Sequence, residues 1–344
     1  MRHATEHSPE TPQSAPSESG DVLTDSPGKS DGPAGGKRLL SWLKITAGSA
    51  IVLVSFYFLA SRLIRDWHQI PFSRISVSPL RLAAAFAILL LHFPLYGWLW
   101  RTILAALGAR IGVPKATAIS AVSAIGKYAP GKVWFTLGRM SLAKLEDVAE
   151  DKTLLSIVLE IAFTLLAGLM LLGIAVLLLP RSQVPAIVYS LFILAPVCLG
   201  VLYPPVLNRV LGVVLKWFRR PPFELRLSYG RLLSILGICL LDWLTQGFGC
   251  FVLIGSFCPL DAAKLPVLLG GYAISWMIGF LVLVSPAGLG IREGVFTLVL
   301  KTVVSEPVAI IAAVVTRVWM TVGELTAALA GFVFLRITSR RKND

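Results

Sequence analysis

The sequence of 344 residues is 56% hydrophobic and 15% charged, with a mean hydropathy of +0.76. This composition excludes an ordinary soluble domain, because apolar runs of about 20 residues recur and that length spans a bilayer. The formal charge of +13 sits mostly in short loops and tails, where the positive-inside rule and anionic lipid headgroups explain it better than nucleic acid does. The sequence therefore predicts a multi-pass membrane protein.

The chain divides into two tails and a membrane domain. Residues 1–36 are rich in Ser, Pro, Gly and acidic residues, which predicts a disordered tail. Residues 37–336 hold the apolar segments and form the predicted transmembrane domain, and residues 337–344 form a basic tail. Lys and Arg at both borders place the two termini in the cytoplasm. No short apolar core with a cleavage site opens the chain, so we expect no cleaved signal peptide.

Seven apolar segments are long enough to cross a bilayer. They lie at about 40–63, 80–104, 153–179, 184–201, 232–257, 266–284 and 308–335. Tyr96, Trp98 and Trp100 are expected in an aromatic belt at the membrane interface. The basic stretch between residues 201 and 232, with its proline pairs, is interpreted as a cytoplasmic loop. Seven crossings would leave the basic C-terminus outside, so we expect about eight, one of them discontinuous.

Two Pro-Gly breaks, at 125–139 and 285–294, organise this bundle. Pro removes a backbone donor, and broken backbone at membrane depth survives only where protein covers it or it lines a wet cavity. Residues 116–125, before the first break, are too short to span and fit a half-helix. The sequence therefore predicts an all-α polytopic membrane helix bundle with two re-entrant or discontinuous helices in an inverted repeat.

Four ionisable side chains lie inside predicted spans: Glu160, Asp242, Arg317 and Glu324. A charge at the bilayer centre costs about 2.5 to 3.5 kcal/mol, so these side chains should face the interior and find partners. Arg317 and Glu324 share one helix face, roughly 10 Å apart. We expect each to pair with Glu160 or Asp242, or Arg317 to hold a phosphate between them. Ion pairs that only fix helix packing are the alternative.

Each break also supplies parts of an anion site. A half-helix that begins after a break presents unpaired N–H groups, and Arg139 or Arg292 could complete a site for a headgroup phosphate. We expect both arginines to converge with the four intramembrane residues on one cavity; an ordinary interfacial loop is the alternative. The predicted substrate-binding residues are Lys127, Pro130, Gly131, Lys132, Arg139, Glu160, Asp242, Pro286, Gly288, Gly290, Arg292, Glu293, Arg317 and Glu324.

The cysteines and histidines form no pattern typical of a metal site. The four cysteines lie in or beside apolar segments without CxxC spacing, which favours buried free thiols. The four histidines are scattered, and His92, inside a predicted span, is interpreted as a packed, hydrogen-bonded residue, with a proton carrier as the alternative. We therefore expect no metal, no cofactor and no catalytic residue.

The sequence at the two breaks resembles a known family. Residues 128–134 read Tyr-Ala-Pro-Gly-Lys-Val-Trp and are followed by Gly138 and Arg139; residues 285–294 read Ser-Pro-Ala-Gly-Leu-Gly-Ile-Arg-Glu-Gly. Over about residues 40–335 the chain resembles the membrane domain of bacterial lysylphosphatidylglycerol synthase/flippase proteins and their stand-alone relatives. The resemblance implies a flippase-like fold in the bacterial inner membrane. The synthases add a soluble aminoacyl-transferase domain, which we do not expect here, and their first break more often reads Pro-Gly-Arg or Pro-Gly-Gly.

The expected function is that of a flippase-like transporter, not an enzyme, which moves or handles an anionic phospholipid or a polyprenyl-linked lipid. One alternative is a non-transporting membrane partner of envelope lipid or glycan enzymes. The other is a membrane transferase that uses intramembrane carboxylates, although no loop offers an Asp-x-Asp pair, a Gly-rich phosphate loop or a nucleophile with its base. The expected partners are a membrane lipid with an anionic headgroup and, as protein partners, a homo-oligomer or envelope biosynthesis enzymes; nucleic acid is not expected.

Overall fold

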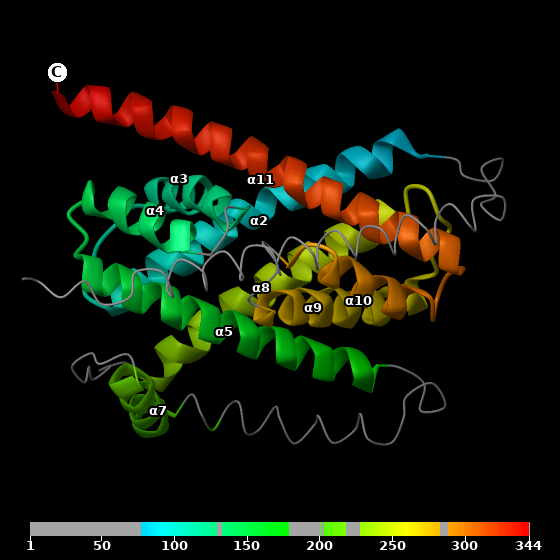
Figure 1. Cartoon of the computed structure of the whole chain (residues 1–344), viewed down its shortest axis with the longest axis horizontal. Helices are drawn as coiled ribbons and strands as arrows, with labels where there is room; N and C mark the ends of the chain where they lie inside the picture. The colour runs from blue at the N-terminus through cyan, green and yellow to red at the C-terminus, as the bar shows by residue number, and fades with distance from the viewer. Residues whose placement is uncertain are drawn as a thin grey trace, which may run out of the picture. The chain divides into compact units, whose positions relative to one another are not determined.

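A computed structural model describes residues 77–128, 133–178, 200, 203–217, 228–282 and 288–343, all within the unit Trp42–Asp344. The elements in these ranges are helical (Figure 1), which confirms the all-α prediction for the described part of the chain. The predicted N-terminal tail, the span at 40–63 and nearly all of the span at 184–201 lie outside the described residues. In chain order the elements are α2 (Pro79–Ala106), α3 (Val113–Ala124), η3 (Ile125–Tyr128), α4 (Val133–Lys144), α5 (Glu150–Leu177), α7 (Pro204–Trp217), α8 (Tyr229–Ile254), η6 (Ala262–Lys264), α9 (Leu265–Leu281), α10 (Ile291–Leu300) and α11 (Glu306–Asn343).

Five helical segments in the described ranges are long and apolar enough to cross a membrane. They are Pro79–Ala106, Glu150–Leu177, Tyr229–Ile254, Ala262–Leu281 and Glu306–Ser339. Each coincides with one of the seven predicted segments, so those five predictions are confirmed. With 28 residues, α2 is about 42 Å long, more than the about 30 Å of a hydrocarbon core. The last helix, α11, continues to Asn343 through the border predicted at residue 336.

The start of α2 is fixed by a local cap and by the end of α8. Ser78 precedes the helix and accepts a hydrogen bond from the backbone N–H of Arg81, while Pro79 fits the first turn, where no intrahelical N–H bond is needed. The Arg81 side chain donates to the carbonyl of Gly255 at 2.8 Å. The first turn of α2 therefore meets the last turn of α8, and the two helices pack as antiparallel neighbours.

The bundle has apolar side chains both in its core and on its outer surface, and a smaller set of polar side chains is buried inside. Large apolar side chains such as Leu80, Leu91, Phe248 and Leu329 are exposed. The buried polar side chains include Ser156, Gln246 and Thr316 together with the charged residues Arg139, Glu160, Asp242, Glu293 and Glu324. Exposed apolar surface of this extent is rare on soluble proteins, whereas it is favourable against lipid.

Short helices flank both breaks. With 12 residues each, α3 and α4 are about 18 Å long, and α10 with 10 residues is about 15 Å long. None is long enough to cross alone, and α3 takes the place of the half-helix predicted at 116–125. The short helix α3 packs against α2, α4 and α11, and α10 packs against α9 and α11. In Figure 1 α11 runs alongside α3 and α10.

Two expectations are wrong. The predicted loop after residue 201 contains α7, because Pro204 and Pro205 occupy the first helical turn and valines then recur every three or four residues. The prediction that Trp100 belongs to an aromatic belt at the membrane interface is also wrong. Trp100 is fully buried, and its Nε1 donates to Ser156 Oγ at 2.9 Å. A partner for the indole N–H inside the bundle makes that burial favourable.

Candidate functional site

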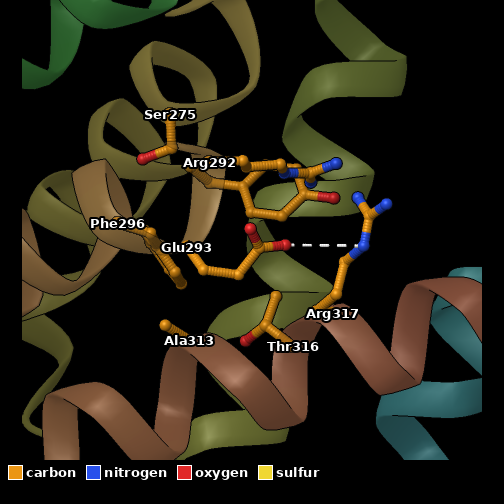
Figure 2. A pocket seen from close by; sticks show the side chains of 8 residues that line it. Ser275, Arg292, Glu293, Phe296, Ala313, Thr316 and Arg317 are labelled. Atoms are coloured by element: carbon orange, nitrogen blue, oxygen red, sulfur yellow. Dashed lines mark ion pairs between the residues drawn. The ribbon is translucent and has the colours of Figure 1, made fainter. Parts of the chain in front are cut away.

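A small pocket lies between α9, α10 and α11, at the end of the second break (Figure 2). Its free volume of about 10 Å³ holds about one water molecule. Arg292 and Glu293 reach it from α10, and Arg317 and Thr316 face them from α11. The lining residues are Tyr272, Ser275, Arg292, Glu293, Phe296, Ala313, Thr316 and Arg317.

The start of α10 sets the position of two of these side chains. Gly290 precedes the helix with φ +80°, and its N–H donates to Glu293 Oε2 at 2.6 Å, the one bond of a capping box that a glycine at this position can form. Gly288 has φ +68°, and its α-carbon approaches the backbone of Gly279 in α9 so closely that a Cβ would lie 2.7 Å from the Gly279 carbonyl oxygen. Only glycine fits such a conformation and contact without strain, so this turn directs Arg292 and Glu293 toward α11.

The charges around the pocket are only loosely paired. Glu293 Oε1 lies 3.4 Å from Arg317 Nε, the contact drawn as a dashed line in Figure 2. Within the described part of the chain, Glu293 Oε1 and Arg317 Nη2 are buried without a hydrogen-bond partner. The Arg292 guanidinium lies 4.9 Å above the centre of the Tyr272 ring. Two guanidinium groups and one carboxylate therefore border the pocket, with hydrogen-bonding capacity left for a ligand.

A second ion pair lies next to the pocket on α11. Lys127, in η3, donates to Glu324 Oε1, and the Tyr128 hydroxyl donates to Glu324 Oε2 at 2.7 Å. The Arg317 guanidinium carbon lies 5.8 Å from the centre of the Tyr128 ring. Residues of the first break thus contact the helix that carries the pocket arginine.

Another buried pair lies at the first break. Arg139 in α4 donates from Nη1 to Glu160 Oε2 in α5 at 2.7 Å, and the Tyr96 hydroxyl donates to the other oxygen of Glu160. The guanidinium also packs over the rings of Phe135 and Trp100, at 4.5 and 5.0 Å. Arg139 is fully enclosed and does not line the pocket.

Asp242 is the centre of a polar chain between α2 and the pocket wall. Its Oδ1 lies 2.6 Å from His92 Nδ1, and its Oδ2 accepts from Gln246 Nε2 at 3.0 Å. The Tyr272 hydroxyl in turn donates to Gln246 Oε1 at 3.3 Å. Because Tyr272 lines the pocket, two hydrogen bonds join it to Asp242.

The expected partners of the α11 charges are wrong. Arg317 meets Glu293 and Glu324 meets Lys127, not Glu160 or Asp242. The reason is that α10 and η3 both contact α11 and bring these two residues closer than α5 does.

The structure brings three of the fourteen predicted site residues, Arg292, Glu293 and Arg317, to the pocket wall. Gly288 and Gly290 shape the turn before it, and Lys127 and Glu324 pair beside it, while Arg139, Glu160 and Asp242 lie in the other two polar clusters. The remaining four, Pro130, Gly131, Lys132 and Pro286, lie outside the described residues.

Sequence reasoning missed the neutral polar members of these clusters. They are Tyr96, Tyr128, Tyr272, Ser275 and Thr316. A hydroxyl group within or beside an apolar segment could have indicated these residues, because a buried hydroxyl needs a hydrogen-bond partner. Over the described ranges, no group of three or more His, Cys, Asp or Glu side chains is placed to hold a metal ion.

Comparison with family models matches residues 45–327 to the lysylphosphatidylglycerol synthase TM region. The chain belongs to this family. The match spans both breaks and every pocket residue, and it confirms the resemblance seen in the motifs. This member of the lysylphosphatidylglycerol synthase TM family is an integral, multi-pass membrane protein, and the family comparison detected no catalytic domain in its 344 residues. A search of curated proteins gave no match.

Proposed function

We propose that this protein moves a lipid with an anionic headgroup across the membrane and that the pocket between α9, α10 and α11 binds the headgroup phosphate. The observation that carries this proposal is the buried Arg317 Nη2, which has no hydrogen-bond partner among the described residues and lies beside a second guanidinium, that of Arg292. A buried donor without a partner is costly, and a phosphate oxygen would satisfy it with a charge-assisted hydrogen bond. An anionic phospholipid and a polyprenyl-linked lipid share this phosphate.

Binding requires the pocket to widen, because a phosphate does not fit a space that holds one water. The 3.4 Å contact between Arg317 and Glu293 is the weak point at which α10 and α11 can separate. A phosphate can replace Glu293 on Arg317, because the Glu293 carboxylate keeps its bond from the Gly290 N–H. The headgroup would then cross through a polar path while the acyl or prenyl tails stay in the bilayer, which avoids the cost of taking a charge into hydrocarbon.

The proposed architecture has about eight crossings, with the two breaks as re-entrant or discontinuous helices of an inverted repeat. The short lengths of α3, α4 and α10 support this arrangement, since none of them spans alone. The proposed location is the bacterial inner membrane with both termini in the cytoplasm, supported by the basic residues at the end of α11.

Reconstitution into liposomes tests the proposal. Arg317→Gln should lower the rate at which an anionic phospholipid changes leaflet by about tenfold or more, because hydrogen bonds to a charged group contribute about 1.5 to 3 kcal/mol. Arg317→Lys should recover only part of the rate, since one ammonium cannot form the two parallel bonds of a guanidinium. The matched control is Arg336→Gln, on the same helix but exposed beside Phe332, which should move lipid at the wild-type rate.

The proposal fails if wild-type protein moves no lipid above protein-free liposomes. It also fails if the Arg317→Gln variant inserts, purifies normally and moves lipid as fast as wild type, because Arg317 would then not bind the headgroup.

A further inference from the structure

We infer that His92 and Asp242 form a proton-binding site whose occupancy is linked to that of the headgroup pocket, so that a proton accompanies each anionic headgroup. The inference rests on the proposed function for its transport consequence, whereas the linkage between the two sites is a separate property. It is carried by the geometry of the pair, by the charge balance of the interior and by the hydrogen bonds that lead to the pocket.

The pair joins two membrane-spanning helices in the interior. His92 on α2 and Asp242 on α8 are buried, and their Nδ1 and Oδ1 atoms lie 2.6 Å apart. The second oxygen of Asp242 accepts from the neutral Gln246 amide. No Lys or Arg in the described ranges forms an ion pair with Asp242. When His92 is neutral, its carboxylate partner therefore carries a buried charge that only neutral donors stabilise, and a proton on His92 would convert the pair into an ion pair.

Histidine is the side chain that gains and loses a proton near neutral pH. In the tautomer whose Nδ1–H donates to Asp242, an entering proton occupies Nε2. The pair then changes from a neutral imidazole beside a carboxylate to an imidazolium beside a carboxylate, and its net charge rises from minus one to zero. Loss of the same proton restores the starting state, so one proton is taken up and one released per cycle.

The described charges inside the bundle balance when His92 is neutral. The cations are Lys127, Arg139, Arg292 and Arg317, and the carboxylates are Glu160, Asp242, Glu293 and Glu324. Three carboxylates meet a lysine or arginine, and Asp242 meets the histidine. Within the described ranges Arg292 forms no ion pair and lies instead over the Tyr272 ring.

A phosphodiester bound at Arg292 and Arg317 adds one negative charge to this balanced interior. A proton on His92 compensates this negative charge and returns the net charge of the interior to zero. Since an uncompensated charge at the bilayer centre costs about 2.5 to 3.5 kcal/mol, headgroup binding and protonation favour each other, and by linkage the effect is mutual. Moving the two together also avoids moving a net charge through the membrane potential.

The two sites are physically connected through Gln246 and Tyr272. Asp242 accepts from Gln246, Gln246 accepts from Tyr272, and Tyr272 forms a wall of the pocket beneath Arg292. A change in the charge of the pair therefore reaches the pocket through two hydrogen bonds.

Other titratable groups around the pair already have partners. The buried or half-buried titratable side chains on the surrounding helices include Tyr96 on α2, Lys115 on α3, Lys152 and Glu160 on α5, Cys239 and Cys250 on α8, Tyr272 on α9, and Arg317 and Glu324 on α11, whereas Arg81 and Arg101 on α2 and Arg231 on α8 are exposed. Tyr96 bonds to Glu160, and Glu160 also bonds to Arg139. Lys115 pairs with Glu146, Arg317 with Glu293 and Glu324 with Lys127. Among the bases Lys115, Arg317 and His92, His92 is therefore the one whose charge can change without breaking an ion pair that the other groups already form.

The linkage is tested on the full-length chain by the titration of His92 in nanodiscs. Substituting His3, His7 and His68 with Gln leaves His92 as the sole histidine, and NMR of ¹⁵N-labelled imidazole follows its protonation. Nanodiscs of phosphatidylcholine alone are compared with nanodiscs that contain phosphatidylglycerol. We expect phosphatidylglycerol to move the titration midpoint upward by about one pH unit, a tenfold rise in proton affinity within the usual range of coupling between sites. The shift should disappear with Arg317→Gln.

Control and transport measurements complete the test. Arg336→Gln, which removes an exposed positive charge from the same helix as Arg317, should keep the shift, which separates the linkage from a general effect of surface charge. In liposomes with an internal pH dye, an inward proton gradient should speed entry of phosphatidylglycerol several-fold and acidify the lumen with it. His92→Gln should abolish both effects.

Each outcome decides one of the two proposals. A midpoint that does not respond to phosphatidylglycerol, or a shift that survives Arg317→Gln, overturns the linkage. Lipid movement that is fast but independent of the gradient overturns proton coupling and leaves the proposed function standing. A clear shift in the titration without any lipid movement supports the linked sites and refutes transport.

Discussion

At each of the two breaks an arginine meets a glutamate of a neighbouring helix, but the two contacts differ in geometry. At the first break Arg139 and Glu160 are 2.7 Å apart, hydrogen bonded and closed off from solvent. At the second, Arg317 and Glu293 are 3.4 Å apart without a hydrogen bond, and 11% of the Arg317 side chain is exposed at the pocket. Arg139 also has one unbonded nitrogen, Nη2, but aromatic rings cover its guanidinium.

The difference teaches that residue type does not decide what a buried ion pair does. Neither member of a closed pair has another partner of opposite charge within reach, so removing one member leaves the other as an uncompensated charge. The pair of Arg139 and Glu160 therefore holds α4 against α5. A loose pair next to a pocket can exchange one partner for a ligand at low cost. The ion pair at the first break thus has the geometry of a structural contact, and the ion pair at the second break has that of a binding site.

The largest expected effect is at the closed pair. Arg139→Gln leaves Glu160 buried with only the Tyr96 hydroxyl, and we expect a loss of about 3 to 5 kcal/mol of stability, typical of removing one partner of a buried pair. Thermal unfolding of the detergent-solubilised protein measures it.

Two controls sharpen this result. Lys144→Gln removes a second ion pair of α4, the one between Lys144 and Glu150. The side chains of these two residues are 71% and 53% exposed, so no change in unfolding temperature is expected. The double variant Arg139→Gln with Glu160→Gln should regain part of the stability, since no charge is left alone. A double variant as unstable as the sum of the two single ones would show that the pair itself does not fasten the helices.

The next effect concerns the shape of the second break. Gly288→Ala places a Cβ at φ +68° and against the Gly279 carbonyl, which we expect to cost about 1 to 3 kcal/mol of strain and to displace α10. Lipid movement should fall together with the unfolding temperature. The control is Gly294→Ala inside α10, where a Cβ meets nothing within 4 Å and helix propensity predicts a gain of about 0.5 to 1 kcal/mol. Equal behaviour of the two variants would contradict the assigned role of Gly288.

The smallest effect on stability is expected at the loose pair. Glu293→Gln keeps an oxygen for the Gly290 N–H and removes the charge beside Arg317, so we expect a loss of about 1 kcal/mol or less. Because Arg317 then loses its competitor for phosphate, binding of phosphatidylglycerol should become tighter, which vesicle flotation measures. Destabilisation as large as that of Arg139→Gln would show that the two breaks do not differ in the way described.

Several properties of this protein follow from its sequence alone. Long apolar segments determined the membrane class and the five described spans within a few residues, because a continuous apolar segment in a bilayer satisfies its own backbone hydrogen bonds as a helix. The charge cost inside the bilayer also determined that Glu160, Asp242, Arg317 and Glu324 would find partners.

Only the tertiary structure decided which partners those charges found. Helix periodicity gives the face on which Arg317 lies, but the residue opposite it depends on which elements contact α11. Of these, α10 brings Glu293 to Arg317 and η3 brings Lys127 to Glu324. Helix packing also enclosed Arg139 among aromatic rings of α2 and α4 and left Arg317 at a pocket, a distinction that no local pattern carries. The physical reason is that apolar segments differ little in how well they pack against one another in lipid, so helix neighbours are selected by close approaches such as that of Gly288 to Gly279 and by the pairing of buried charges.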